Sequence, residues 1–312
     1  MSNDEMAQIV DTSDEWIYSH TGIHNRHIAA PDEAASDLGA AAARKALDAA
    51  GIGPEEIDLV LLATSTPDYV GLPSTACVVQ DSLGISNAGA MDVMAACSGF
   101  VYALETARNF VEAGTAGKVL VVGAEVYSKI INWQDRTTCV LFGDGAGAVV
   151  VSAADDSSES WVGKALLASE GKEAESLYRS HGGTRNRYVE GETPEEELYL
   201  KMNGRRVYNF AVRAVIDTIQ HLLDEAGMRF EDLDYVVPHQ ANARILEAAA
   251  KRKGWDIDKF YINIAEYANT SAASIPIALG EMQAKGMLKR GMKLATVGFG
   301  SGLTYGGSLI SW

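Results

Sequence analysis

The chain has 312 residues, 47 % of them hydrophobic, and carries a formal net charge of −16 at pH 7. It is long enough to bury a large core and to hold two fused half-domains. The acidic balance excludes general affinity for nucleic acid, because phosphate binding needs a positive surface field.

Three cysteines occur, Cys77, Cys97 and Cys139, without a C-x-x-C pair and without histidines at metal-ligand spacing. We therefore expect neither a disulfide framework nor a metal site, and we expect a reducing, cytoplasmic location. The first five residues are polar and acidic, and no apolar run approaches the length of a bilayer-spanning helix. These features predict a chain with no recognisable export signal and no membrane partner.

Helical and apolar runs alternate along the chain. The first half contains a predicted helix over 33–50 and strands over 88–94 and 118–123. The second half opens on an apolar run at 161–167 and continues with a helix over 207–226 and a strand at 235–237. The polar, Gly-rich segment 170–203 between them is expected to be a surface excursion rather than a linker.

Two parts of the sequence repeat at an offset of about 175 residues. Residues 50–61 match 226–237, each a helix end, a capped turn and a buried strand, and 118–123 match 293–298. The repeat predicts an α/β protein built from two parallel-sheet halves with helices on both faces. The run at 161–167 has no counterpart in the first half. We therefore expect the first half to lack its opening strand. Residues before Met1 would supply that strand, which we expect to be an inner strand of the first sheet.

Cys97 lies in the segment AACSG, between the strand predicted at 88–94 and a helix that starts near residue 100. The pKa of an unperturbed cysteine thiol is about 8.5, and the N–H groups and positive dipole end at a helix start favour the thiolate. Cys97 is therefore a candidate nucleophile for a thioester. The alternative is that it is a small buried hydrophobic residue, which is common for a free cysteine.

Two polar segments follow later in the chain, PHQAN at 238–242 and NTSAAS at 269–274. Both an imidazole and a carboxamide can donate hydrogen bonds to a carbonyl or enolate oxygen in a dry pocket, where charge develops. His239 and Asn269 suit that role, although each alone could be an ordinary loop residue. Strand-to-helix junctions of both halves would bring them to one site with Cys97.

Almost the whole chain is similar to β-ketoacyl-acyl-carrier-protein synthase III, the thiolase-fold condensing enzyme that starts type II fatty-acid synthesis. The motifs that carry the resemblance are DTSDEWI at 11–17, TGI at 21–23, AACSG at 95–99, FGDGAGA at 142–148, PHQAN at 238–242, NTSAAS at 269–274 and GFGSG at 298–302. The resemblance implies a five-layer αβαβα thiolase-like fold. Its halves would be residues 1–158, with the nucleophile, and 159–312, with the histidine and asparagine.

The resemblance also implies a reaction and its partners. In the family an acyl group passes from acyl-CoA to the cysteine, here Cys97, and then condenses with malonyl-acyl carrier protein as CO2 leaves. His239 and Asn269 would stabilise the enolate. The family is homodimeric, and coenzyme A enters as a thioester substrate, with no metal or redox cofactor.

Further site residues follow from the resemblance by position. Phe299 would border the thiol, and the backbone amides of Cys97 and Ser301 would form a second oxyanion site. The residues expected at the coenzyme A site are Trp16 and Arg136, which would sandwich the adenine, and Gly204 and Asn242, which would touch the pantetheine arm. The residues expected to receive the carrier protein are Arg244, Lys251 and Arg252, and Leu72 is expected at the end of the acyl tunnel.

The sequence departs from the family at several of these places. His20 stands where an arginine is usual near the CoA phosphates, and Asn209 replaces a commonly basic residue. Leu72 occupies a position that often holds a larger residue, so the length of the starter acyl group stays open.

Other thiolase-fold enzymes are disfavoured. Degradative thiolases need a second cysteine near the carboxyl terminus, and elongating ketosynthases use two histidines. Two alternatives remain open: an acyltransferase of secondary metabolism that works without decarboxylation, and a catalytically silent interaction subunit.

Overall fold

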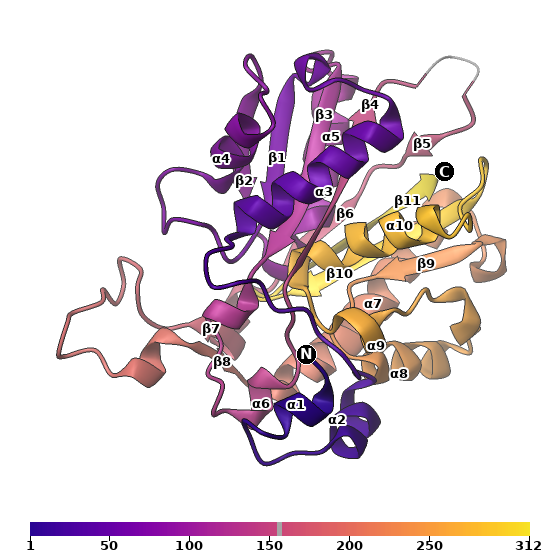
Figure 1. Ribbon diagram of the computed structural model, residues 1–312. Helices are drawn as coiled ribbons and strands as arrows, with labels where there is room; N and C mark the ends of the chain where they lie inside the picture. Colours follow the sequence, from indigo (N-terminus) through magenta and orange to yellow (C-terminus); the bar gives the residue numbers. More distant parts are fainter. Residues whose placement is uncertain (155–157) are drawn as a thin grey trace.

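The computed structural model describes residues 1–154 and 158–312 (Figure 1). The first sheet has the strand order β2-β1-β3-β4. Its strands are β1 (Leu59–Ala63), β2 (Gly89–Val93), β3 (Lys118–Glu125) and β4 (Gly145–Ser152). β1 runs parallel to β2 and β3, whereas β4 is antiparallel to β3. β1 is buried along its whole length, as expected of a parallel strand with helices on both faces.

The second sheet repeats this plan. Its strands are β5 (Trp161–Val162), β6 (Leu166–Ser169), β9 (Tyr235–Pro238), β10 (Lys293–Gly300) and β11 (Thr304–Ser311). β10 lies between the parallel β9 and the antiparallel β11. The apolar run at 161–167, predicted as one strand, forms two, because the Ala165 N–H leaves the ladder and donates to the Glu105 carboxylate at 3.0 Å.

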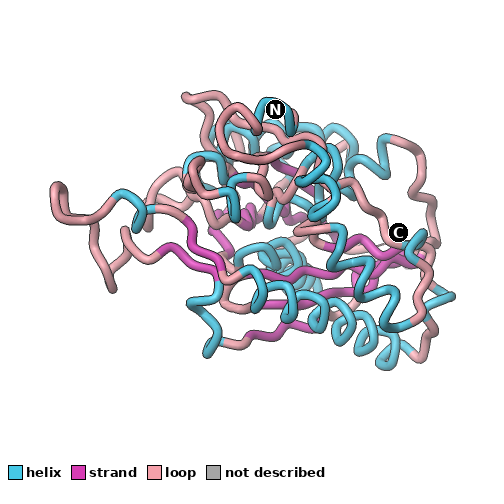
Figure 2. The backbone as a smooth tube through the Cα atoms, turned by 90° about the horizontal axis from the view of Figure 1, so that it is seen from below, coloured by secondary structure: helices cyan, strands magenta, loops and turns pink. Residues whose placement is uncertain are grey.

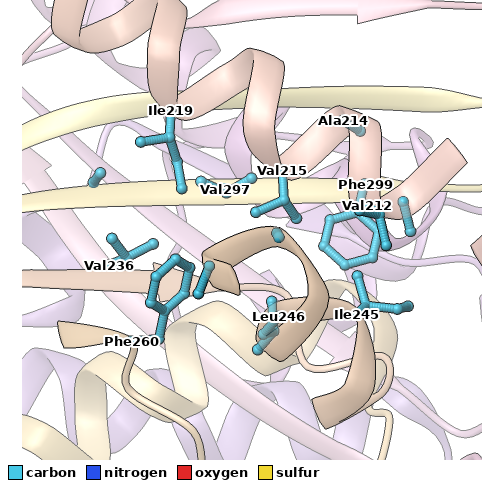
Figure 3. Packing of buried hydrophobic residues seen from close by; sticks show 14 of the residues in the cluster. Val212, Ala214, Val215, Ile219, Val236, Ile245, Leu246, Phe260, Val297 and Phe299 are labelled. Carbon is cyan, nitrogen blue, oxygen red and sulfur yellow. The ribbon is translucent and has the colours of Figure 1, made fainter. Parts of the chain in front are cut away.

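Helices cover both faces of each sheet. α3 (Ala35–Ala50) and α4 (Thr75–Ser82) pack on the outer face of the first sheet. α5 (Gly99–Glu112) and α10 (Ser274–Ala284) lie between the sheets. α7 (Gly204–Ala226) and α8 (Ala243–Lys253) cover the outer face of the second sheet, where Figure 3 shows Val215 and Leu246 against Val297. The predicted five-layer αβαβα arrangement is confirmed.

The first half lacks an opening strand within the described residues, as the repeat predicted. In the second sheet the opening strands β5 and β6 pair with the outer edge of β11. The equivalent edge in the first sheet belongs to β4, which pairs only with β3 in the part of the chain that is described. The opening strand of such a half therefore has its place at the sheet edge, and our prediction of an inner strand is wrong.

Two segments lie outside the layered body. The amino-terminal segment forms α1 (Asn3–Met6) and α2 (Asp14–Thr21) and packs near α8 and α9 (Ile264–Tyr267), where the His24 N–H donates to the Ala265 carbonyl at 2.9 Å. The excursion at 170–203 contains the antiparallel pair β7 (Leu177–Arg179) and β8 (Leu200–Met202), and Figures 1 and 2 show it extending from the body. We keep the division into 1–158 and 159–312 as a proposal.

Candidate active site

Cys97 lies at the junction between the two halves. It occupies a 3-10 turn, η2 (Ala96–Ser98), between the end of β2 and the start of α5, and is 3 % exposed. The end of β10 passes so close that a Cβ on Gly300 would lie 2.7 Å from the Cys97 nitrogen. Glycine at this position is what allows the second half to reach the backbone of the cysteine.

The surroundings of Cys97 favour the protonated thiol. Burial raises the pKa of Cys97 to about 12, and the nearby Glu125 adds to the rise. The Ser271 hydroxyl and the backbone N–H groups of Cys97 and Ser301 act in the opposite direction. Our expectation that the helix start would favour a thiolate is wrong for the free protein, because desolvation outweighs these donors.

The two backbone amides that act on the thiol are the pair expected for an oxyanion site. The Cys97 amide comes from the turn before α5, and the Ser301 amide comes from the loop after β10. The Ser301 hydroxyl donates to the Leu177 carbonyl, which ties this loop to β7. The arrangement directs two fixed N–H donors at the sulfur, where an acyl oxygen would lie beside them.

His239 follows directly after β9 and is 1 % exposed. Its backbone N–H donates to the Val297 carbonyl at 2.7 Å, and the edge of the Phe299 ring packs against the imidazole with 5.0 Å between centroids. Burial lowers the pKa of His239 to about 3, so the ring is neutral at pH 7. Nδ1 lies 2.7 Å from the Ser274 hydroxyl, which leaves Nε2 for a ligand.

Asn269 lies in the loop between α9 and the turn η8 (Ser271–Ala273), where its backbone pairs with the FGDG segment. The Asn269 N–H donates to Leu141, and its carbonyl accepts from Gly143, both at 3.0 Å. The amide oxygen Oδ1 accepts the Ser271 N–H at 2.9 Å. This bond fixes the orientation of the carboxamide and leaves the Nδ2 hydrogens as the donors available to a substrate.

Ser271 connects the three predicted residues, and sequence reasoning gave it no role. Its N–H donates to Asn269 Oδ1 at 2.9 Å, and its carbonyl accepts the Ser274 hydroxyl at 2.8 Å, which in turn lies 2.7 Å from His239 Nδ1. Its own hydroxyl is buried without a hydrogen-bond partner among the described residues, and it lowers the pKa of the Cys97 thiol. The residue is fully buried with φ +50°, an unusual backbone conformation for a serine. The structure therefore brings Cys97, His239 and Asn269 together around one residue of the NTSAAS motif.

A buried carboxyl group behind the thiol was also missed. Glu125 ends β3 and accepts hydrogen bonds from the Thr66 hydroxyl at 2.7 Å and the Ser65 N–H at 3.0 Å. Burial raises its pKa and outweighs these bonds. The sequence contains one indication of Glu125, namely that it lies at the carboxyl end of an apolar strand.

Trp16 and Arg136, expected to sandwich the adenine, lie in direct contact. Trp16 lies on α2, Arg136 starts the short helix α6 (Arg136–Cys139), and the guanidinium carbon lies 4.8 Å from the Trp16 ring centroid. His20 stacks on the same tryptophan with 4.4 Å between centroids. Trp16 and Arg136 each have a flat face on which a planar base could stack. In this structure, however, the two faces contact each other directly.

The residues predicted along the pantetheine arm lie at helix starts. Asn242 caps α8, because its Oδ1 accepts the Arg244 N–H at 2.8 Å, and its Nδ2 donates to the His20 carbonyl at 3.1 Å. Gly204 is the first residue of α7 and is exposed, and a Cβ there would meet only the Met202 side chain, at 3.9 Å. The cap engages both polar atoms of Asn242 in structural hydrogen bonds.

The predicted basic face divides into two kinds of residue. Arg244 is engaged within the chain, since it donates to the Ser19 carbonyl at 3.0 Å and to the Glu247 carboxylate at 2.6 Å. Lys251 and Arg252 lie in the last turn of α8 and are exposed. Their positive charges are therefore the more accessible part of this face.

Leu72 lies in the loop between β1 and α4 and is 86 % exposed. Val70 in the same loop and Met94 after β2 are also exposed apolar residues. Leu72 and Val70 therefore expose large apolar side chains in the loop after β1, and Met94 does so directly after β2.

The structure has no helix in its described ranges that is long and apolar enough to cross a bilayer. Within residues 1–154 and 158–312 no group of three or more His, Cys, Asp or Glu side chains could hold a metal ion.

Known proteins resemble the chain over its full length. The family described as 3-oxoacyl-(acyl-carrier-protein) synthase III matches residues 91–171, and its carboxyl-terminal counterpart matches residues 223–312. The β-ketoacyl-acyl-carrier-protein synthase III of Clostridium acetobutylicum is 48 % identical over 100 % of this chain and 94 % of that protein. The enzyme of the same name from Caldanaerobacter subterraneus subsp. tengcongensis is also 48 % identical, over 100 % of this chain and 93 % of its own.

A solved structure agrees with these relatives. The crystal structure of 3-oxoacyl-acyl-carrier-protein synthase III from Aquifex aeolicus VF5 matches with a TM-score of 0.91 and 42 % identity, and covers 100 % of this chain and 95 % of that one. Full coverage at this identity extends the likeness to the segments that hold Cys97, His239 and Asn269. The chain belongs to the 3-oxoacyl-(acyl-carrier-protein) synthase III family of condensing enzymes.

Proposed function

We propose that the chain transfers an acyl group from acyl-CoA to Cys97 and condenses it with malonyl-acyl carrier protein. The products are 3-oxoacyl-acyl carrier protein, CoA and CO2. One observation carries the proposal: the turn η8, whose Ser271 fixes the Asn269 carboxamide and, through the Ser274 hydroxyl, contacts the His239 ring, packs against the turn that holds the buried Cys97 thiol. Family membership supports the same reaction.

In the first half-reaction the Cys97 sulfur attacks the thioester carbonyl of acyl-CoA. The Cys97 thiol starts protonated, so its proton is released as the sulfur attacks and is taken up by the CoA sulfur when the C–S bond to CoA breaks, while negative charge develops on the acyl oxygen in between. The backbone N–H groups of Cys97 and Ser301 are fixed before the reaction and would stabilise that oxygen. Collapse of the tetrahedral intermediate expels CoA and leaves acyl-Cys97.

In the second half-reaction the malonyl group loses CO2 and becomes an enolate. Asn269 Nδ2 and the His239 ring would bind the thioester oxygen on which the negative charge develops. Phe299, packed against His239, would keep water from this pocket. The enolate carbon attacks acyl-Cys97, and the cysteine sulfur leaves.

The substrate approach would use both ends of α8 and the amino-terminal segment. Trp16 and Arg136 would bind the CoA adenine, with Gly204 and Asn242 beside the pantetheine arm. Lys251 and Arg252 would attract an acidic carrier protein, since local positive charge speeds association with an acidic partner. Arg244 would support this face mainly by joining α8 to α2.

We propose that the chain works in the cytoplasm as a homodimer without a metal or redox cofactor. β2 is an edge strand, and an unpaired strand edge is a template for pairing with another chain. Met94, directly after β2, and Leu72, in the loop after β1, also expose large apolar side chains. A partner subunit on this edge would cover both and would let Leu72 reach the partner's acyl tunnel.

The test is a panel of starter acyl-CoA substrates assayed with malonyl-acyl carrier protein. Formation of 3-oxoacyl product and CO2 by the wild-type chain, but not by Cys97→Ala, is the expected result. An acyltransferase of secondary metabolism would load Cys97 without releasing CO2. A silent subunit would show no mass increase after incubation with any acyl-CoA.

A further inference from the structure

The contacts of Ser274 determine which nitrogen of His239 carries a proton. The Ser274 hydroxyl oxygen lies 2.7 Å from His239 Nδ1, 2.8 Å from the Ser271 carbonyl and 3.3 Å from the Gln240 nitrogen. All four residues are buried. The hydroxyl has one hydrogen to donate and two lone pairs to receive.

Only one arrangement of hydrogens satisfies these contacts. A carbonyl oxygen cannot donate, so the Ser274 hydroxyl gives its hydrogen to Ser271. The two lone pairs of Ser274 then accept from the Gln240 N–H and from His239 Nδ1. The opposite arrangement, with the hydroxyl hydrogen on Nδ1, would leave two oxygens 2.8 Å apart with no hydrogen between them. In the neutral ring Nδ1 therefore carries the proton, and Nε2 has a lone pair.

This tautomer has a consequence for the condensation. A neutral ring with a bare Nε2 cannot donate a hydrogen bond to an enolate oxygen. The reaction also needs a proton: when a malonyl carboxylate leaves as CO2 and the product leaves Cys97, the sulfur is left as a thiolate. A second proton on His239 would meet both needs.

The free chain does not provide the charge that such a proton requires. Burial lowers the pKa of His239, and among the described residues only the Ser271 carbonyl opposes that effect. Neither Glu125 nor Tyr127 contributes to it, although both act near Cys97. A carboxylate brought by the substrate would supply the missing negative charge beside the ring.

We propose that Ser274 is a positioning residue that holds His239 as the Nδ1–H tautomer, so that Nε2 accepts a proton when the carboxylated substrate binds. The proton comes from solvent as the malonyl group enters. Nε2–H then donates to the enolate oxygen as the C–C bond to CO2 breaks. Once the enolate carbon has attacked acyl-Cys97 and the C–S bond has broken, Nε2 gives the proton to the thiolate. This inference rests on the proposed function.

The tautomer is read directly by two-dimensional NMR of protein labelled with 15N-histidine, with His239→Gln to assign the signal. The expected wild-type pattern has the proton on Nδ1, and a ring protonated on Nε2 alone would overturn the proposal. Proton uptake is read by calorimetry in two buffers of different ionisation enthalpy, with a stable amide analogue of malonyl-pantetheine as the probe. Uptake of about one proton by wild type and none by His239→Gln is expected; equal uptake by both overturns the proposal.

Activity separates positioning from folding. Ser274→Ala should load Cys97 from acyl-CoA at the wild-type rate but lose at least tenfold in condensation, and Ser274→Thr, which keeps the hydroxyl, should recover most of that loss. Ser308→Ala is the matched control, since Ser308 is an equally buried hydroxyl that contacts Thr296. Unchanged condensation in Ser274→Ala would overturn the inference. Absence of condensation in the wild type would instead refute the proposed function.

Discussion

The guanidinium of Arg136 and the ring of Trp16 are in direct contact, with 4.8 Å between the guanidinium carbon and the ring centroid. A planar base stacked between them would need a contact distance of about 3.5 Å on each side. The pair must therefore separate by about 2 Å or more before an adenine can enter. Arg136 is the exposed partner and is held to the amino-terminal segment by one bond, from Nη1 to the Asp11 carbonyl at 2.9 Å.

This contact predicts a selective effect on coenzyme A binding. Arg136→Ala should raise the KM for acyl-CoA about tenfold, because one stacking surface is lost, and should leave the KM for malonyl-acyl carrier protein unchanged. Arg136→Lys should recover little, since an ammonium cannot stack as a guanidinium does. Steady-state kinetics with each substrate varied in turn checks this. Equal changes for both substrates would place Arg136 outside the nucleotide site.

Substitution of the nucleophile and substitution of the carboxamide should block different half-reactions. Cys97→Ala should abolish acyl loading, which intact-protein mass spectrometry measures directly. Asn269→Ala should keep loading but lower condensation about 10²–10³-fold, the usual loss when one oxyanion donor is removed. Loading of Cys97→Ala at the wild-type rate would show that another residue is acylated.

The buried imidazole should make stability depend on pH. The pKa of His239 is lowered to about 3 in the folded chain, against about 6.5 when unfolded, so protons bind the unfolded state preferentially between these values. The resulting stability is complete above pH 6.5 and is lost as the pH falls, by about 1.4 kcal/mol per pH unit. Urea unfolding from pH 7 to 5 should show a smaller loss for His239→Gln than for wild type.

His221 on α7, which is half-buried and pairs with Glu225, provides the control for this comparison. His221→Gln should follow the wild-type dependence on pH. If His239→Gln lost stability as steeply as wild type, the folded ring would already be protonated near neutral pH.

The regular part of this fold could be predicted from the sequence, because it depends on periodicity. The strand at 235–237 and the helix that ends before Gly227 appear where the repeat placed them. The position of an opening strand could not be predicted, since apolar pattern carries no information on which sheet edge a strand joins. The second sheet resolves this, because both β5 and β6 lie beyond the antiparallel β11.

The sequence predicted only those site residues whose side-chain type itself indicates a reactive or hydrogen-bonding role. Cys97, His239 and Asn269 stand out as reactive or polar groups in small-residue loops. Ser271 and Ser274 do not, because a serine in NTSAAS has many ordinary roles and only three-dimensional contacts give it this one. The protonation of Cys97 was mispredicted for a similar reason: a helix start is visible in the sequence, whereas complete desolvation is not.

The basic face of α8 should act on the carrier protein through its free charges. Lys251→Glu and Arg252→Glu should raise the KM for malonyl-acyl carrier protein several-fold and weaken its dependence on salt, with little change for acyl-CoA. Arg244→Glu should in addition lower the melting temperature, because it breaks the bond to Ser19 and puts a second carboxylate beside Glu247. If the two exposed positions had no effect on either substrate, the carrier protein would dock elsewhere.

Leu72 tests the dimer and the acyl tunnel together. Leu72 is 86 % exposed, so its apolar side chain contributes no hydrophobic stabilisation within one subunit. A second copy of the chain that covered it would bury that surface. In the proposed dimer it would close the partner's tunnel, and its branched aliphatic side chain would leave more room than an aromatic ring. Leu72→Phe should therefore shift the preference toward acetyl-CoA in a competition assay with longer acyl-CoA substrates, while size-exclusion chromatography shows an unchanged dimer.

Leu72→Asp should weaken the dimer, because the carboxylate would be buried without a partner. An unchanged chain-length profile in a dimeric Leu72→Phe protein would mean that other residues close the tunnel.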